Sequence, residues 1–269
     1  MSYLIDTHCH LHDREFFTEA QAKTMLENAH ARGIRQIICI GTNNDDSLAA
    51  RDFAKKHDNV FWTYGIHPEF ARDSSCSGTR TKPEHEPSSK LVAIGEVGLD
   101  YHYPGYDRQK QIELLEQMLD LAIQLDLPCS LHVRDAFDDF FAVIKNFPKL
   151  KPSVLHSFSD SPENLAKALS RDFYIGINGL ATFANLDCYK DLASDFLSRV
   201  ILETDAPFLT PVPNRGKINE PGNVADVASW LAKKIGVSSE QIAEWTTKNA
   251  RTIFNLPHPE PNHGADPRA

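Results

Sequence analysis

The sequence predicts one α/β domain, a (β/α)8 barrel of the TIM type. Short apolar runs alternate with helix-like stretches along almost the whole chain, and eight such runs can be counted. The 269 residues are about the length that such barrels use. No internal repeat or linker interrupts the pattern. We therefore expect residues 1–256 to form the barrel and residues 257–269, which contain four prolines, to be a disordered tail.

Each strand is predicted from an apolar run and from the turn residues that close it. The second run is β-branched and ends at Gly41-Thr42-Asn43-Asn44, and the third ends at Gly65-Ile66-His67-Pro68. The fourth continues into Glu96-Val97-Gly98-Leu99-Asp100. The predicted strands are residues 3–10, 34–40, 60–66, 91–95, 128–132, 153–157, 173–178 and 199–203.

The intervening stretches have helical composition, and the clearest is amphipathic, with Ile112, Leu115, Leu119 and Ala122 at helical spacing. The predicted helices are residues 18–32, 45–57, 107–125, 135–146, 162–170, a segment around 187–197, and 224–235, 239–248 and 250–254. Residues 69–90 are rich in Ser, Pro, Thr and charge and lack apolar periodicity. They are predicted to form a long surface loop with at most a short helix.

Composition narrows the class of protein. The apolar fraction is 41% and the net charge is −9, so no basic field attracts nucleic acid to the whole surface. This argues against a non-specific coating protein, but it leaves open an enzyme whose metal ions meet a phosphate. Five scattered cysteines without C-x-x-C, with Cys39 and Cys129 in apolar runs as core residues, predict a reducing compartment. Without a leader or an apolar run of membrane length, a cytoplasmic protein with no membrane and no obligate protein partner is expected.

Unusual polar residues cluster at the ends of the predicted strands, where barrel enzymes place their active sites. His8 and His10 end the first strand and share one face because side chains alternate along a strand. The other strand-end residues are His67, Glu96, His132 with Arg134, His156, and Glu203 with Asp205. A single buried histidine is usually a core residue, but so many strand ends with His or carboxylate are hard to explain that way.

Six of these residues predict a site for two divalent metal ions: His8, His10, Glu96, His132, His156 and Asp205. A carboxylate such as Glu96 can bridge two cations, one on each oxygen. Four imidazoles with two carboxylates suit Zn²⁺, Mn²⁺ or related ions better than Ca²⁺, and Mg²⁺ is also a candidate cofactor. Paired ions generate hydroxide at neutral pH and stabilise an in-line displacement at phosphorus. The same set can hydrolyse a carbonyl, so it predicts a hydrolase more firmly than it predicts the substrate.

Six motifs resemble, in order, those of the TatD family of metal-dependent deoxyribonucleases, which are related to the amidohydrolase barrels. They are Asp6-x-His8-x-His10, Gly65-Ile66-His67-Pro68, Gly95-Glu96-Val97-Gly98-Leu99-Asp100, Leu131-His132-Val133-Arg134-Asp135, Leu155-His156-Ser157-Phe158 and Glu203-Thr204-Asp205-Ala206-Pro207. The later segment Arg215-Gly216-Lys217-x-Asn219-Glu220-Pro221 is also similar. The resemblance spans the chain to about Leu256.

The resemblance implies a role for each candidate residue. His8, His10, Glu96 and Asp205 would hold one metal ion, and Glu96, His132 and His156 the second. Asp205 would accept the proton of the attacking water. Asp205 and Glu96 would be the catalytic residues. His67 would contact a phosphate or another part of the substrate, and Arg134, Glu203 and Asn219-Glu220 would orient ligands or close the rim. For Arg134 and Glu220, simple pairing with neighbouring charges is an equal alternative. Asp100 is expected to order a loop.

Three departures from the family pattern stand out. His12 adds a third alternating histidine, which we place on the rim and do not count as a ligand. Residues 69–90 replace an expected helical stretch and put substrate access beside His67 in question. Tyr101-His102-Tyr103-Pro104 can stack on a base or pack on the barrel, and packing is the preferred reading.

The leading hypothesis is a divalent-metal-dependent phosphodiesterase that acts on DNA, and possibly on RNA, near strand ends. The first alternative is a hydrolase of an ester, amide, lactone or aminoacyl-tRNA, because the barrel and the metal ligands would serve these reactions as well. The second is a metal-binding or partner-binding barrel without turnover, for which the net charge and the irregular 69–90 segment are the only indications.

Overall fold

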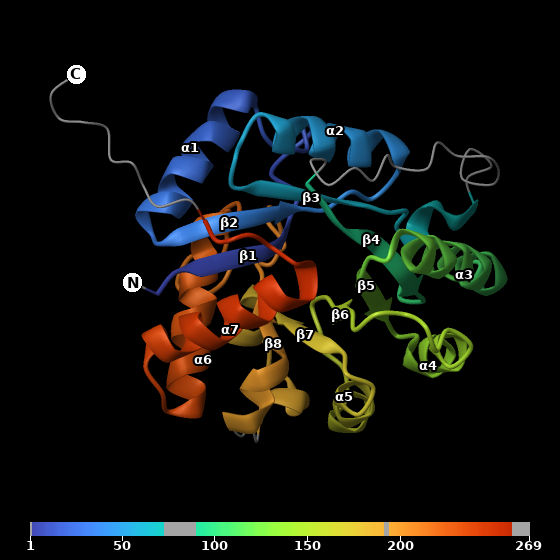
Figure 1. Ribbon diagram of the computed structural model, residues 1–269. Helices are drawn as coiled ribbons and strands as arrows, with labels where there is room; N and C mark the ends of the chain where they lie inside the picture. Colours follow the sequence, from blue (N-terminus) through green and yellow to red (C-terminus); the bar gives the residue numbers. More distant parts are fainter. Residues whose placement is uncertain (1, 73–89, 191–193, 260–269) are drawn as a thin grey trace, which may run out of the picture.

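A computed structural model describes residues 2–72, 90–190 and 194–259 and confirms the predicted (β/α)8 barrel (Figure 1). Eight strands pair in parallel in the order β1-β2-β3-β4-β5-β6-β7-β8. Their bounds are β1 Leu4–Cys9, β2 Ile34–Cys39, β3 Val60–Tyr64, β4 Leu91–Asp100, β5 Cys129–Arg134, β6 Val154–Leu155, β7 Tyr174–Ile177 and β8 Val200–Leu202. Because all eight strands run parallel, their carboxyl ends meet at one mouth of the barrel.

The sheet closes between β8 and β1 at that mouth. The backbone amide of Asp205 donates to the carbonyl oxygen of His8 over 2.8 Å, and that of His10 donates to Ala206 over 2.7 Å. The buried carboxylate of Asp6 reinforces this closure by accepting from the backbone amide of Thr204 at 2.9 Å and from its hydroxyl at 2.7 Å. These contacts hold together segments that are almost 200 residues apart.

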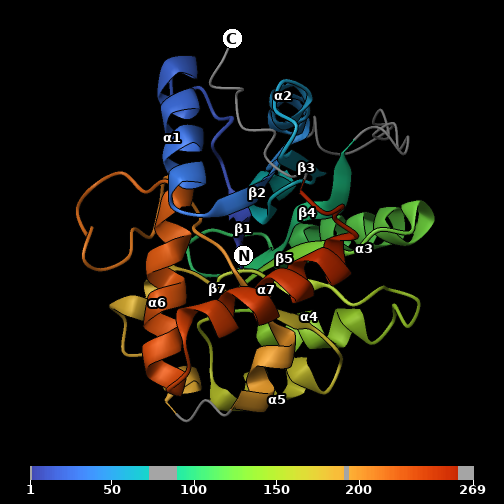
Figure 2. The same ribbon diagram turned by 60° about the vertical axis from the view of Figure 1, so that its left-hand side comes forward.

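Helices surround the sheet (Figures 1 and 2). They are α1 Glu19–Ala31, α2 Asn44–Lys55, α3 Arg108–Leu125, α4 Phe137–Ile144, α5 Pro162–Leu169, α6 Val224–Ile235 and α7 Ser239–Phe254. Both α1 and α7 begin with a capping box, in which Thr18 or Ser238 accepts from the backbone of the glutamine three residues on. Short 3-10 turns complete the chain at η1 Pro68–Arg72, η3 Gly179–Thr182, η4 Asp187–Tyr189, η5 Ser194–Arg199 and η6 Pro221–Asn223.

Three predicted regions differ in the structure. The fourth strand continues to Asp100 because residues 97–100 pair with β5. Around residues 187–197 the chain forms the turns η4 and η5 in place of an α-helix, with residues 191–193 outside the described part. The last two predicted helices form one continuous helix, α7. Asn249, the residue that the prediction left between them, lies buried inside α7 and donates to the carbonyls of Leu197 and Val200. Of the predicted 69–90 loop, only the turn η1 and Lys90 lie in the described part.

The opposite mouth, at the amino ends of the strands, is covered by α7. Phe254 and Leu256 pack in one cluster with strand residues that include Ile5, Ile38 and Phe61. The Thr247 hydroxyl donates to the carbonyl of Tyr3, and the Gln36 amide donates to the carbonyl of Pro257. The predicted tail therefore starts against the barrel, while residues 260–269 lie outside the described part.

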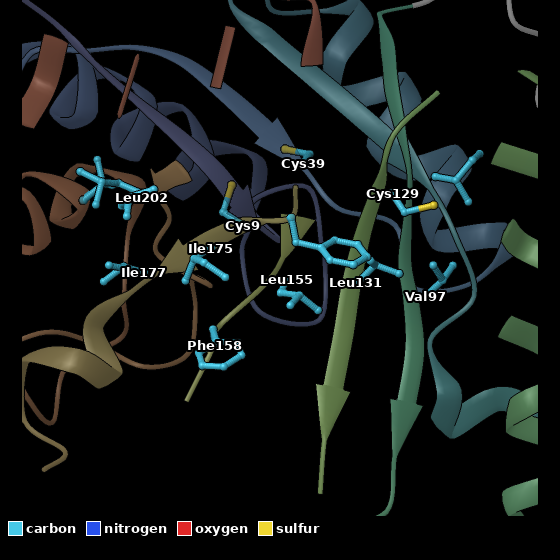
Figure 3. Close-up of a cluster of buried hydrophobic side chains, with 14 of the residues drawn as sticks. Cys9, Cys39, Val97, Cys129, Leu131, Leu155, Phe158, Ile175, Ile177 and Leu202 are labelled. Atoms are coloured by element: carbon cyan, nitrogen blue, oxygen red, sulfur yellow. The ribbon is translucent and has the colours of Figure 1, made fainter. Parts of the chain in front are cut away.

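A second and larger apolar cluster packs the strands against the helices (Figure 3). Cys9, Cys39 and Cys129 are fully buried in it beside aliphatic side chains of neighbouring strands, and they are free thiols. The core positions predicted for Cys39 and Cys129 are confirmed. Among the described residues, no helix combines the length and apolar character that a bilayer span requires.

Close backbone contact between β3 and β4 requires a glycine just after β3. A Cβ on Gly65 would lie 2.2 Å from the carbonyl carbon of Gly95, far inside contact distance. We expect Gly65→Ala to lower the free energy of unfolding by about 3–5 kcal/mol, measured by urea unfolding. Gly105→Ala is the matched control, since Gly105 has φ +89° but open space around it, and it should cost only about 1–2 kcal/mol. Equal losses in the two variants would contradict the steric explanation.

Candidate metal centre

The β8–β1 closure brings together residues from the two ends of the chain. Since the amide of Asp205 is bonded to the carbonyl of His8, the side chains of His8, His10 and Asp205 meet at the mouth of the barrel. The Nε2 atom of His10 lies 3.5 Å from Oδ1 of Asp205, and that of His8 lies 3.7 Å from the same oxygen. His8 and Asp205, which are almost 200 residues apart in the sequence, thus lie next to each other.

The other predicted ligands lie on the same mouth, in a cavity of about 760 Å³. His10, Glu96, His132, His156 and Asp205 line it, together with His67 and Arg134 from the predicted substrate contacts. His8 is fully buried beneath these residues. The structure therefore gathers all six predicted metal ligands in one place.

Glu96 occupies the centre of this group. Its Oε2 atom lies 3.5 Å from Nε2 of His8, whereas its Oε1 atom lies 2.9 Å from Nδ1 of His132 and 3.8 Å from Nε2 of His156. The two carboxylate oxygens thus face different histidines, as expected for a carboxylate that bridges two cations. Sets of ligand atoms within 4.8 Å of one another include His8, His10 and Glu96 on one side and Glu96, His132 and His156 on the other.

The chemistry of these atoms fits a divalent ion. Nε2 of His8 is buried and has no hydrogen-bond partner among the described residues, although carboxylate oxygens lie 3.5 and 3.7 Å away. Two ligands that each lie about 2.0–2.1 Å from a tetrahedral ion are about 3.3 Å apart. A buried imidazole nitrogen directed at two carboxylates, at a spacing too wide for hydrogen bonds and close to that of metal ligands, is what an ion-binding site requires.

Comparisons with known proteins agree with this arrangement. The model of a family described as TatD related DNase matches residues 5–255. The chain belongs to this TatD family.

The metal-dependent hydrolase YcfH of Escherichia coli (strain K12) is 34% identical over 259 residues, which are 94% of this chain and 96% of YcfH. A protein of Erwinia tasmaniensis named 3'-5' ssDNA/RNA exonuclease TatD is 32% identical over 240 residues, which are 86% of this chain and 93% of that protein. The crystal structure of YjjV, a TatD homolog from Escherichia coli K12, superposes with a TM-score of 0.80 at 27% identity, covering 94% of this chain and 98% of YjjV. The protein is accordingly a metal-dependent hydrolase of the TatD family.

In this TatD-family protein the candidate histidine ligands differ in the groups that lie next to the ring nitrogen facing away from the metal cluster. Nδ1 of His10 lies 3.1 Å from the carbonyl oxygen of Ile40, and Nδ1 of His8 lies 3.4 Å from the Ser130 hydroxyl. These partners are neutral. Each imidazole can therefore keep its proton on Nδ1 and present an unprotonated Nε2 to a metal ion.

His132 and His156 are backed by carboxylates instead. Nε2 of His132 lies 3.0 Å from Oδ2 of Asp100, so its Nδ1 faces Glu96. Nδ1 of His156 lies 2.9 Å from Oε1 of Glu203, although out of line for a hydrogen bond. A carboxylate behind a histidine makes the imidazole a stronger metal ligand.

Asp100 was not among the predicted site residues. Besides facing His132, its carboxylate accepts from the backbone amide of His102, so it also orders the loop as expected. The alternation of side chains along a strand could have identified Asp100 as a site residue. Glu96 and Asp100 are four residues apart on one strand and therefore share a face. That signal was lost because the fourth strand was predicted to end at Gly95. Asp100 also forms a further cluster of potential ligand atoms with His67 and His132.

The predicted substrate residues have different surroundings. Nδ1 of His67 accepts from the backbone amide of Glu69, which leaves Nε2–H as a donor toward the cavity. Burial and the neighbouring His132 lower the pKa of His67 to about 4, so it is neutral at neutral pH. Arg134 is exposed on the rim. Glu203 is buried behind His156, does not line the cavity, and accepts from the backbone amide of Ser157 at 2.7 Å.

The structure also places His12, one of the departures from the family pattern, and the Asn219-Glu220 pair, which belongs to the resemblance. His12 is buried and pairs with Asp46, its Nε2 lying 2.9 Å from the carboxylate, so it does not join the metal cluster. Asn219 is buried and donates to the backbone carbonyls of Thr204 and Phe208, which orders the chain after β8. Glu220 accepts from the side chain of Asn28 on α1, away from the cavity.

Charge within the cluster sets its protonation in the metal-free protein. Burial would lower the pKa of His132, but the hydrogen-bonded carboxylates of Asp100 and Glu96 raise it to about 9. Burial would likewise lower the pKa of His156, but the adjacent charge of Glu203 raises it to about 10. Burial would raise the pKa of Asp205, yet the imidazoles of His10 and His156 hold it below its ordinary value. At neutral pH Asp205 is thus ionised.

We expect metal binding to depend on the backing carboxylates. Asp100→Asn and Glu203→Gln should each weaken binding of Zn²⁺ or Mn²⁺ about 10- to 100-fold, measured by competition with a chromogenic chelator, because each removes the charge behind a ligand histidine. Asp139→Asn is the matched control, since Asp139 accepts hydrogen bonds from Tyr101 and Arg108 but does not line the cavity. Losses no larger than that of the control would contradict this role.

Metal binding should also release protons. Because the pKa values of His132 and His156 are raised to about 9 and about 10, both are cationic at pH 7 and must each lose a proton to become ligands. Calorimetric titration at pH 7 in buffers of different ionisation enthalpy should show release of about two protons or more, since the pKa of His10 is raised as well. Apparent affinity should rise with pH and level off above the two pKa values. Binding at pH 7 without proton release would count against these ligands.

Proposed function

We propose that this metal-dependent hydrolase cleaves phosphodiester bonds of DNA, with RNA as a further substrate, starting from a strand end. The observation that carries the proposal is the position of Glu96, whose two oxygens face different histidines, His8 on one side and His132 with His156 on the other. Such a carboxylate can hold two ions side by side, which is the arrangement used for in-line displacement at phosphorus. The exonuclease name of the Erwinia relative and the DNase description of the family point to the same substrate.

In this proposal His8, His10, Glu96 and Asp205 hold one ion, and Glu96, His132 and His156 hold the other. Bound there, the ions supply Lewis-acid activation of a water molecule and of the phosphoryl group. Asp205 is part-exposed to the cavity and ionised at neutral pH, so its carboxylate accepts the proton of the attacking water. His67 donates Nε2–H to a non-bridging phosphate oxygen, and Arg134 pairs with a phosphate at the rim.

The charges around the cavity favour cleavage near a strand end. Eight carboxylate side chains and one arginine occur among the described residues that line it. The carboxylates outside the metal cluster include Asp13, Glu15, Asp45 and Glu69, which follow β1, β2 and β3. These groups repel a polyanion on their side of the cavity. A terminal nucleotide needs phosphates on one side of the scissile bond only.

The same acidic side of the cavity favours one alternative, a compact ester or amide with few negative charges. Amidohydrolase-type chemistry would use the same ligands. A panel of carboxylic esters, amides, an aminoacyl-tRNA and single-stranded DNA distinguishes the two, because cleavage of carbonyl substrates without nuclease activity would select the alternative. A barrel without turnover would show no multiple turnovers on any of them.

We further propose a reducing, cytoplasmic location. The four cysteines of the described part are free and buried in the core, with no disulfide between them.

Purified protein should release nucleotides from labelled single-stranded DNA in Mg²⁺ or Mn²⁺, and EDTA should abolish the activity. Asp205→Asn should lower kcat about 10²- to 10⁴-fold, because it removes the proton acceptor. The control Asp120→Asn alters an exposed carboxylate on α3 and should have no effect. Cleavage that persists in both EDTA and Asp205→Asn would overturn the mechanism.

A further inference from the structure

We propose that exposed aromatic side chains on two opposite sides of the metal cluster are stacking platforms for nucleobases and select single-stranded nucleic acid. The proposal rests on the proposed function and deepens it. The first platform is the pair Phe16 and Phe208, and the second is Tyr103 with Arg134. All four residues line the same cavity as the candidate metal ligands.

The first platform lies beside the β8–β1 closure. Phe16 is in the loop after β1 and Phe208 in the loop after β8, with ring centroids 5.3 Å apart and planes at 82°. Their exposed fractions are 44% and 48%, high for phenylalanine. Phe208 also has its ring centroid 6.4 Å from that of His10, a candidate ligand. A base stacked there would belong to a nucleotide next to the cleaved phosphate.

The second platform lies across the barrel. Tyr103 follows β4 and Arg134 ends β5, and in a closed sheet of eight sequential strands these lie opposite β8 and β1. Tyr103 is 65% exposed, with the guanidinium of Arg134 5.3 Å from its ring centroid. Tyr101 differs: its ring stacks on Tyr106 and its hydroxyl donates to Asp139, so it packs on the barrel. The sequence left both uses open for this loop, and the structure packs Tyr101 on the barrel while it leaves Tyr103 exposed.

Electrostatics explains why stacking is needed. The described residues that line the cavity include eight carboxylates and one arginine, so the basic side chains of this described lining cannot supply the affinity for a polyanion. Stacking of a base on an aromatic ring is independent of charge and of sequence. In a single strand both faces of each base are accessible, whereas a duplex offers only the outer face of its terminal pair, so a single strand gains more from the two platforms. The platforms therefore explain both how an acidic cavity holds nucleic acid and why it prefers single strands.

The test is a thermodynamic cycle with two changes. One removes the aromatic ring of Phe208 from the protein, and the other removes the terminal bases from the DNA substrate. The substrates are dT10 and the same oligonucleotide with abasic residues at both ends, in Mn²⁺. Phe208→Ala should lower kcat/KM on dT10 about 5- to 100-fold. Phe208→Trp should retain activity because it keeps an aromatic face. On the abasic substrate, wild type and Phe208→Ala should be equal. Phe183→Ala, which removes an exposed ring from outside this cavity, is the control and should match wild type on both substrates.

The possible outcomes distinguish a failure of the stacking proposal from a failure of the proposed nuclease function. An equal loss for Phe208→Ala on normal and abasic DNA, or no loss on either, overturns the platform. Binding is measured in parallel by fluorescence anisotropy with phosphorothioate dT10, which resists cleavage. If wild type binds it, Phe208→Ala binds it about 5- to 100-fold more weakly, and no DNA is cleaved, the platform stands and the proposed function fails. If wild type neither binds nor cleaves DNA, both fail.

Discussion

The closure of the sheet between β8 and β1 is the contact on which the metal centre depends. Asp6 links the two strands through the amide and hydroxyl of Thr204, and the amide of Asp205 is bonded to the carbonyl of His8. These bonds fix the backbone positions from which His8, His10 and Asp205 project. Fold stability and ligand geometry thus share one set of hydrogen bonds, and a weaker closure would separate the candidate ligands as well as the strands.

The candidate histidine ligands of the metal cluster differ in the charge of the groups that contact them. The histidines from β1 are backed by a carbonyl and a hydroxyl, whereas His132 and His156 are backed by Asp100 and Glu203. Imidazoles with carboxylates behind them donate more charge to a bound ion. Two ions held by these sets would therefore differ in affinity and in acidity although they share Glu96.

The mouth of the barrel combines an acidic wall with exposed rings. Carboxylates that follow β1, β2 and β3 disfavour a long polyanion, while the exposed rings of Phe16, Phe208 and Tyr103 offer contacts that do not depend on charge. Binding that relies on metal ions and stacking differs from that of proteins which follow the phosphate backbone with lysines. The net charge of −9 is compatible with a nucleic-acid substrate under these conditions.

The sequence by itself determined the barrel and the six candidate ligands. Strand periodicity is local, and parallel order places every strand end at one mouth, so His8, His10 and Asp205 could be assigned to one rim without coordinates. Only the tertiary structure decided which oxygen of Glu96 faces which histidine, that Asp100 and Glu203 stand behind ligands, and that Phe16 meets Phe208. These contacts join loops and strands that are distant in the chain, and their distances depend on side-chain packing that no local pattern encodes.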